Sequence, residues 1–214
     1  MKTKNKKRAD RVKTQKTVVA KPKALTRAEK TKNMVLTGIL TALVVVLYWV
    51  GTVFKVGTVS ITLTLIPIVI GAALCGTKAA VWLGLVFGIN VLADPTTSMF
   101  MTWNIGGTFI TVLAKGALCG LAAAYTYQKF ADRNKIFAVF AAGVVCPVVN
   151  TAVFLLGCVM FFFQGVSSMA SNAGQNVFLF MIVGFVGLNF IVELVINMIV
   201  SPAIIRILDI RKKA

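Results

Sequence analysis

The chain has 214 residues, of which 58% are hydrophobic and 14% are charged, and its mean hydropathy is +0.87. A soluble globular domain is about half apolar and about one quarter charged, so this composition excludes that class and predicts a membrane protein. Histidine is absent, which excludes imidazole metal sites and the hydrolase nucleophiles that need a histidine base. We therefore expect neither an enzyme nor a metal site, and no cofactor.

Residues 1–33 form a strongly basic segment. The whole chain has 23 basic and 6 acidic residues, which give it a net charge of +17, and 13 of the basic residues lie in this segment. The segment has no apolar run to offset the entropy lost on ordering, so we expect a cytoplasmic tail that is disordered or partly helical. We interpret its charge as an orientation signal that also contacts anionic lipid. Nucleic-acid binding is not expected, because no aromatic residue lies among the basic ones to stack on a base.

Six apolar runs follow the tail. A helix needs about 20 residues, at a rise of about 1.5 Å each, to cross a hydrocarbon layer of about 30 Å. The candidate spans are residues 34–54, 61–75, 78–93, 104–125, 135–163 and 176–207. The second and third are short and separated only by Gly76 and Thr77, so they can also be interpreted as one long span or a re-entrant pair.

The basic residues between the spans favour six separate spans. With the tail in the cytoplasm, six spans place Lys78, the cluster at 129–135 and the C-terminal basic residues inside, and leave only Lys55 outside. The sequence thus predicts an all-α integral membrane protein, a six-transmembrane-helix bundle with both termini cytoplasmic. Its expected parts are the tail (1–33), the membrane domain (34–209) and a short cytoplasmic C-terminal tail (210–214).

Pairs of small residues four positions apart occur on three spans. In lipid, such pairs let two helix backbones approach closely. The pairs are Gly38 with Ala42, Gly84 with Gly88, and Gly116 with Gly120. We interpret the last two pairs as packing inside the bundle. For the first pair, internal packing is favoured over a surface that receives the helix of a partner.

Polar residues inside the spans are the candidates for a binding site, because an ionisable group at membrane depth is costly and is usually functional or paired. Asn189, Glu193 and Asn197 share one face of the sixth span. Lys115 lies in the fourth span and Asn150 in the fifth. Further residues with polar groups gather toward the external ends of the spans: Trp103, Asn104, Gln164, Asn172, Gln175 and Asn176. We expect a polar pocket that opens outward.

The sequence contains no phosphate-binding loop of the ATPase type. The segment Gly76-Thr77-Lys78 has the lysine without the glycine spacing that should precede it. If transport uses ATP, another polypeptide hydrolyses it. The four cysteines show no C-x-x-C spacing and are interpreted as packing residues.

Apolar motifs with small residues recur in order along the spans. They are IPIVIGA at 66–72, GTKA at 76–79, GLVFG at 84–88, LAKG at 113–116, GL at 120–121 and NTAVFLLG at 150–157. Together with the six-span pattern, they make the region 34–205 resemble the substrate-binding S components of energy-coupling factor (ECF) transporters.

The resemblance implies a six-helix core in a bacterial plasma membrane that captures a water-soluble vitamin or related micronutrient from outside. Such a subunit then docks onto a membrane coupling subunit carried by two cytoplasmic ATPases. The family's docking helix carries an Ala-x-x-x-Ala pattern, which Gly38 and Ala42 match with glycine in the first place. Thr77 stands where many relatives have proline, a difference expected to affect helix capping more than function.

In this family the ligand contacts lie in the external halves of the later helices and in the external loops. We therefore expect the substrate-binding residues to be Asn104, Lys115, Asn150, Gln164, Asn189 and Glu193. Lys115 either binds the carboxylate of a vitamin such as pantothenate or folate, or pairs with Glu193, and the pair is slightly favoured. Riboflavin would instead use Trp103 and the phenylalanines at 161–163 for stacking.

Two other classes of protein remain open. A solitary ion-coupled secondary transporter of a small polar solute would use Glu193 as its proton-coupling carboxylate and would need no ATPase. A structural membrane protein would need no pocket, and the polar face of the sixth span counts against that class.

Overall fold

The computed structural model describes residues 26–53, 55–56, 59–60 and 63–213. Most of the predicted tail, residues 1–25, lies outside this part. The chain divides into two units, Met1–Lys32 and Asn33–Ala214. Helix α2 (Arg27–Val53) begins in the first unit, before residue 34, because Thr26 and Glu29 cap it reciprocally. The backbone N–H of Thr26 donates to Glu29 Oε2 at 2.8 Å, and that of Glu29 donates to Thr26 Oγ1 at 3.3 Å.

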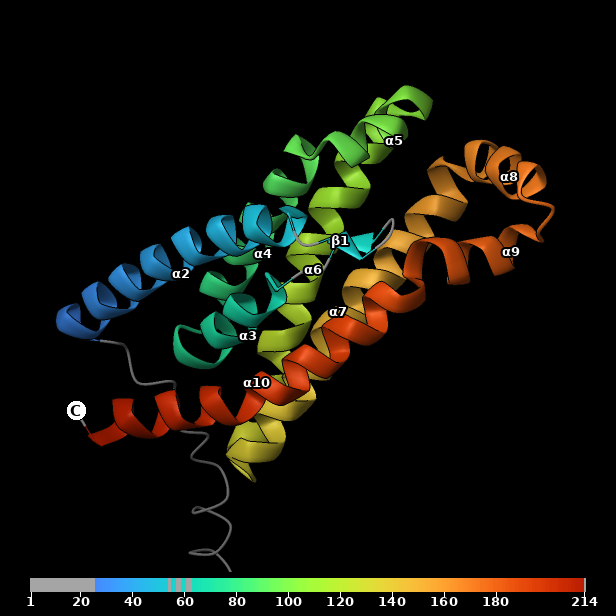
Figure 1. Cartoon of the computed structure of the whole chain (residues 1–214). Coiled ribbons are helices and arrows are strands. Elements are labelled where there is room, and N and C mark those ends of the chain that lie inside the picture. Colours follow the sequence, from blue (N-terminus) through green and yellow to red (C-terminus); the bar gives the residue numbers. More distant parts are fainter. Residues whose placement is uncertain (1–25, 54, 57–58, 61–62, 214) are drawn as a thin grey trace, which may run out of the picture. The chain divides into compact units, whose positions relative to one another are not determined.

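The described part of the chain is almost entirely helical, which confirms the predicted fold class at this level. Two-residue strands, β1 (Lys55–Val56) and β2 (Val59–Ser60), form an antiparallel pair. The remaining elements, labelled in Figure 1 where there is room, are α3 (Leu65–Leu74), α4 (Thr77–Ala93), η1 (Pro95–Thr97), α5 (Ser98–Trp103), α6 (Ile105–Ala131), α7 (Lys135–Phe161), α8 (Phe163–Asn172), α9 (Val177–Phe180), the π-helix η2 (Met181–Val186) and α10 (Gly187–Lys213).

Helix length and apolar composition support several membrane spans. In the described residues, four helical segments are long and apolar enough to cross a bilayer: Arg27–Thr52, Ile105–Ala131, Lys135–Phe161 and Val177–Ile207. Helix α4 and the segment η1–α5 meet at a bend of 73°, and they count as a fifth span if this bent pair is taken as one. Helix α3 has only 10 residues. The structure thus confirms a multi-span helical protein, with four or five spans by these criteria where the sequence predicted six.

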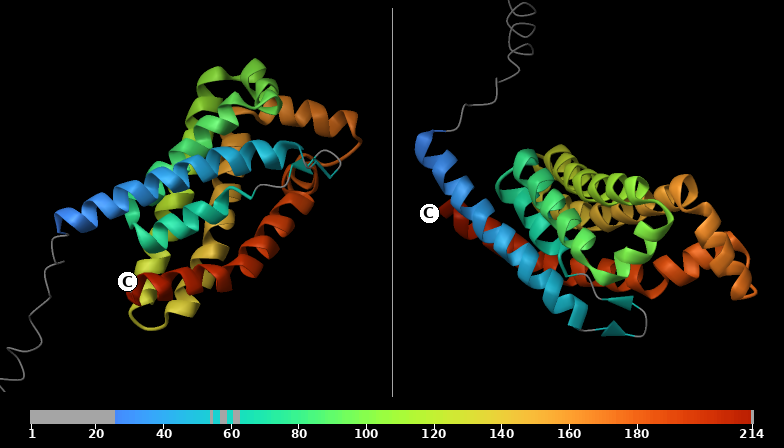
Figure 2. Two further views of the ribbon diagram at one scale, coloured as in Figure 1. Left: turned by 60° about the vertical axis from the view of Figure 1, so that its left-hand side comes forward. Right: turned by 90° about the horizontal axis from the view of Figure 1, so that it is seen from above.

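The glycines of α4 and α6 bring these two helices into close contact. A Cβ atom added to Gly84 would collide with the carbonyl oxygen of Gly116, and one added to Gly116 would collide with that of Gly84. A Cβ on Gly88 would lie 3.0 Å from the carbonyl oxygen of Val112. The predicted internal packing of these pairs is confirmed. Helix α6 also lies beside α7, and α7 packs against α10 (Figure 1; Figure 2).

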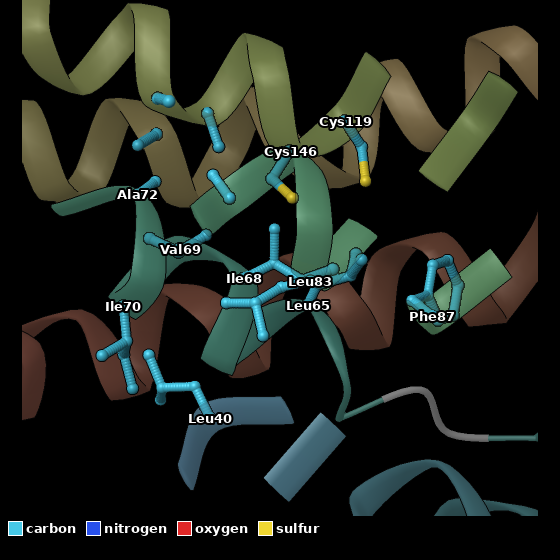
Figure 3. Close-up of a cluster of buried hydrophobic side chains, with 14 of the residues drawn as sticks. Leu40, Leu65, Ile68, Val69, Ile70, Ala72, Leu83, Phe87, Cys119 and Cys146 are labelled. Carbon is cyan, nitrogen blue, oxygen red and sulfur yellow. The ribbon is translucent and has the colours of Figure 1, made fainter. Parts of the chain in front are cut away.

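The main hydrophobic core surrounds α3. Leu65, Ile68 and Val69 of this helix are completely or almost completely buried. Figure 3 shows them near Leu83 of α4 and Cys146 of α7. Helix α3 is short, and its apolar side chains are enclosed by several longer helices.

Helix α2 contributes only one stripe to this core. Leu40, Val44 and Tyr48, four positions apart, are buried. Gly38 and Ala42 are instead exposed, and a Cβ atom on Gly38 would have no atom within 4 Å. The internal packing favoured for this pair from the sequence is therefore wrong within the described part of the chain. The surface around it is open and apolar.

Candidate ligand-binding site

A cavity of about 500 Å³ is lined by residues from α4 through η2. This volume lies within the range of about 300–1,000 Å³ that small-molecule sites occupy. Most of its lining is aromatic or carries hydroxyl groups: Phe100, Phe154, Phe162, Phe180, Phe185, Thr96, Thr97, Thr108 and Thr111.

The phenylalanines of this cavity contact one another. The ring centroid of Phe100 lies 5.2 Å from that of Phe162 and 5.8 Å from those of Phe154 and Phe185. The rings meet edge to face or at a tilt, the arrangement that their quadrupoles prefer. The result is an aromatic wall on which a planar ligand can stack.

Lys115 of α6 brings a positive charge to this wall. Its Nζ lies 5.3 Å from the ring centroid of Phe154 and 5.6 Å from that of Phe87. Cation–π contacts of this kind are worth about 0.5–2 kcal/mol, and they hold the ammonium group between two ring faces. Lys115 is thereby placed beside the cavity.

A second cavity, of about 170 Å³, adjoins the first and is more polar. Lys115, Phe154 and Phe185 line both cavities, while Asn150 and Glu193 line the smaller one. The structure therefore brings together three of the six residues that the sequence indicated for substrate binding.

Asn150 has an unusual environment within this smaller cavity. Its side chain is 8% exposed, and its Oδ1 atom accepts no hydrogen bond from any residue that the structure describes. A buried polar atom without a partner costs about 1–3 kcal/mol, so such atoms are rare unless a ligand or water completes them. Asn150 is accordingly a candidate for a ligand contact, as is Thr111 in the larger cavity, whose Oγ1 likewise has no partner among the described residues.

The other three predicted residues do not join this group. Asn104 is exposed and caps α6, because its Oδ1 accepts the backbone N–H of Gly107 at 2.8 Å. Gln164 is exposed on α8 and lines neither cavity. The side chain of Asn189 lies outside the described part of the structure.

Sequence reasoning missed the threonines and most of the phenylalanines. Thr108, Thr111 and Lys115 follow one another at spacings of three and four residues, so they share one face of α6. Phe154 likewise stands four positions after Asn150 on α7. A search for threonine and phenylalanine on the faces that carry the buried polar residues could have found them.

A bundle of apolar helices that encloses an aromatic cavity next to buried polar groups defines a membrane protein that binds a small molecule. The family model for the ECF transporter, substrate-specific component, matches residues 32–205. The chain belongs to this family, which confirms the resemblance seen in the sequence. Searches of curated proteins and of solved structures return no match.

Membership defines the role in outline. The family consists of multi-pass membrane proteins that capture the substrate of an ECF transporter and associate with its coupling and ATPase modules. They are transporter subunits that bind a small molecule, and they are not enzymes.

Proposed function

We propose that this chain captures a water-soluble vitamin or related micronutrient in a bacterial plasma membrane and delivers it to a membrane coupling subunit with two cytoplasmic ATPases. The proposal includes six membrane spans with both termini in the cytoplasm. It keeps the division expected from the sequence into an N-terminal tail, a membrane domain and a short C-terminal tail. Family membership and the two adjoining cavities support it. For Asn104, Gln164 and Asn189, contact with the substrate remains a prediction from the sequence.

The juxtaposition of an aromatic and a polar cavity carries this proposal. A planar ring system fits against Phe100, Phe154 and Phe185 in the larger cavity. A hydrogen-bonding or acidic substituent of the same molecule would then lie near Lys115 and Asn150. We therefore propose an aromatic vitamin with a polar or carboxylated end, which combines the two ligand types that the sequence left open.

The decisive experiment is native mass spectrometry of the detergent-purified chain, with identification of any small molecule that it retains. Lys115→Met should weaken retention at least tenfold, because a charge-assisted hydrogen bond contributes about 1.5–3 kcal/mol. Lys129→Met is the matched control, since Lys129 lies on the same helix and lines neither cavity. Equal retention in the two variants would contradict the assignment of Lys115, and a chain that never retains a compound would contradict capture.

We further propose that Gly38 and Ala42 form the docking surface for the coupling subunit. Their exposure on α2 supports this assignment, because small residues allow a second helix to approach closely. Ala42→Trp should abolish uptake by the complete transporter and leave retention of the bound compound unchanged. The control is Leu156→Trp, which places the same bulky side chain at an exposed position of a different helix, α7. This variant should leave uptake normal. Loss of retention in Ala42→Trp would assign the residue to the fold of the subunit.

A solitary proton-coupled transporter is the second candidate. Glu193 favours it, because a carboxylate that is 3% exposed lines the polar cavity at membrane depth. This candidate requires uptake by the chain in cells that lack any coupling subunit or its ATPases, and loss of that uptake in Glu193→Gln. Uptake that depends on the ATPases would exclude it.

A further inference from the structure

Asp94 occupies the corner where α4 ends and η1 begins, and it has two sets of hydrogen-bond donors. Its Oδ1 accepts the backbone N–H of Thr96 at 2.8 Å and the hydroxyl of Thr96 at 2.7 Å. Its Oδ2 accepts the hydroxyl of Tyr48, on α2, at 2.8 Å. Asp94 is 8% exposed and Tyr48 is 9% exposed, so this is a buried bond between elements 46 positions apart in the sequence.

The corner continues directly into the wall of the larger cavity. Thr96 and Thr97 of η1, and Met99 and Phe100 of α5, all line that cavity. The bend of 73° at this corner turns η1 and α5 away from the direction of α4. The carboxylate that caps η1 at this bend therefore contacts the segment that forms this wall.

The far end of α5 is held by a different contact. A Cβ atom on Gly165 of α8 would collide with the indole of Trp103, so the absence of a side chain there admits the tryptophan ring. The segment that closes this side of the cavity is thus attached at Trp103 by packing and at Asp94 by the hydrogen bond from α2.

We propose that Tyr48 is a positioning residue for ligand capture: through Asp94 it holds the η1–α5 wall against the cavity. Neither Tyr48 nor Asp94 lines the cavity, so the pair acts through the wall. The role of Tyr48 in ligand capture rests on the proposed function. Its control of access to the cavity is independent of that function.

The test measures access to the cavity without any ligand. In a full-length chain with its four cysteines replaced by alanine, Val112→Cys supplies a reporter, since Val112 lines the larger cavity and is 6% exposed. A positively charged methanethiosulfonate reagent then modifies the reporter. Tyr48→Phe, which removes only the hydroxyl, should raise the modification rate about fivefold, the factor expected from loss of one hydrogen bond. Tyr125→Phe, at an exposed position of α6, is the matched control and should change the rate less than twofold.

Two further variants separate positioning from general stability. Asp94→Asn keeps one oxygen, which can accept either the Thr96 donors or the Tyr48 hydroxyl, so it should raise the rate less than Asp94→Ala, which keeps neither acceptor. Ala142→Cys reports on the core, because Ala142 is fully buried and lines neither cavity. An unchanged rate at Val112→Cys, or an equal rise at both reporters, would overturn the proposal. The assay contains neither vitamin nor coupling subunit. A result that overturns the role of Tyr48 would therefore leave the proposed capture function standing, and a result that overturns capture would leave the role of Tyr48 in cavity access standing.

Discussion

The Oδ1 atom of Asn150 leads to a prediction about stability and binding. Asn150→Leu removes a buried polar atom that no described residue satisfies, so the free energy of unfolding should stay unchanged or rise slightly. Retention of the bound compound should fall about fivefold, through loss of one hydrogen bond. Thermal unfolding in detergent and native mass spectrometry measure the two effects.

Asn90 provides the matched control for this substitution. It is also 8% exposed, but its Nδ2 donates to the carbonyl oxygen of Val86 at 2.8 Å. Asn90→Leu should therefore lower the free energy of unfolding by about 1 kcal/mol and leave retention unchanged. The opposite pattern, with Asn150→Leu destabilised and still loaded, would make Asn150 a structural residue.

A second prediction concerns the charges of Lys115 and Glu193. If they stabilise each other, Lys115→Met and Glu193→Gln should each lower the free energy of unfolding by about 3 kcal/mol, because each leaves a charge buried without its partner. The double variant should lose clearly less than the sum. Equilibrium unfolding in mixed micelles, arranged as a double-mutant cycle, gives the coupling free energy.

The exposed residues Lys129 and Asp132 provide the control cycle, for which we expect additive effects within about 0.5 kcal/mol. Additive losses at Lys115 and Glu193 as well would show that the two charges act separately. Lys115 would then be available to a substrate carboxylate, and its replacement should impair retention more than stability.

The sequence predicted three cavity residues because an amide or a charge inside an apolar run is expensive and therefore conspicuous. The role of Asn104 could not be assigned by this reasoning. An asparagine at the start of a span serves equally well as a helix cap or as a ligand contact, and only the structure reveals the bond by which Asn104 caps α6. The phenylalanines were not predictable individually, since the same residue type fills ordinary membrane cores.

At the level of helices, the contact between α4 and α6 leads to a third prediction. Gly116→Ala places a methyl group against the backbone of Gly84, which cannot move aside as a side chain can. The substitution should lower the free energy of unfolding by about 1–3 kcal/mol, the usual cost of overpacking. Gly38→Ala is the control and should be neutral or slightly stabilising, because its Cβ meets no atom within 4 Å and alanine favours helix. Equal stability of the two variants would show that α4 and α6 can separate at little cost.

The apolar runs predicted where helices occur better than where they bend or stop. Each of the six runs contains a helix, but α3 covers only Leu65–Leu74 of the run at 61–75. The last run is interrupted by a π-helix over Met181–Val186, and α10 then continues to Lys213, beyond the expected boundary at residue 209. Hydropathy measures apolar length and carries no information on hydrogen-bond register, so these breaks were not predictable from it.

At the level of the whole molecule, the proposed topology gives a fourth prediction. Ser98, Ser168 and Asn134 are exposed and lie between predicted spans. As single cysteines in a background without native ones, Ser98→Cys and Ser168→Cys should react with an impermeant maleimide in intact cells. Asn134→Cys should react only after the membrane is permeabilised. External labelling at position 134 would contradict the six-span arrangement.

The shortness of α3 also bears on the lipid around the protein. Ten residues reach about 15 Å, half of the hydrocarbon thickness of about 30 Å, and the N-terminal end of α3, at Thr64, is completely buried. The polar backbone groups at the ends of so short a helix would lie at membrane depth, where no water is present to satisfy them. Enclosure by the longer helices therefore keeps α3 away from lipid, and the bilayer instead meets those longer helices. The melting temperature should accordingly depend little on acyl-chain length, which nanodiscs of short-chain and long-chain lipids would show.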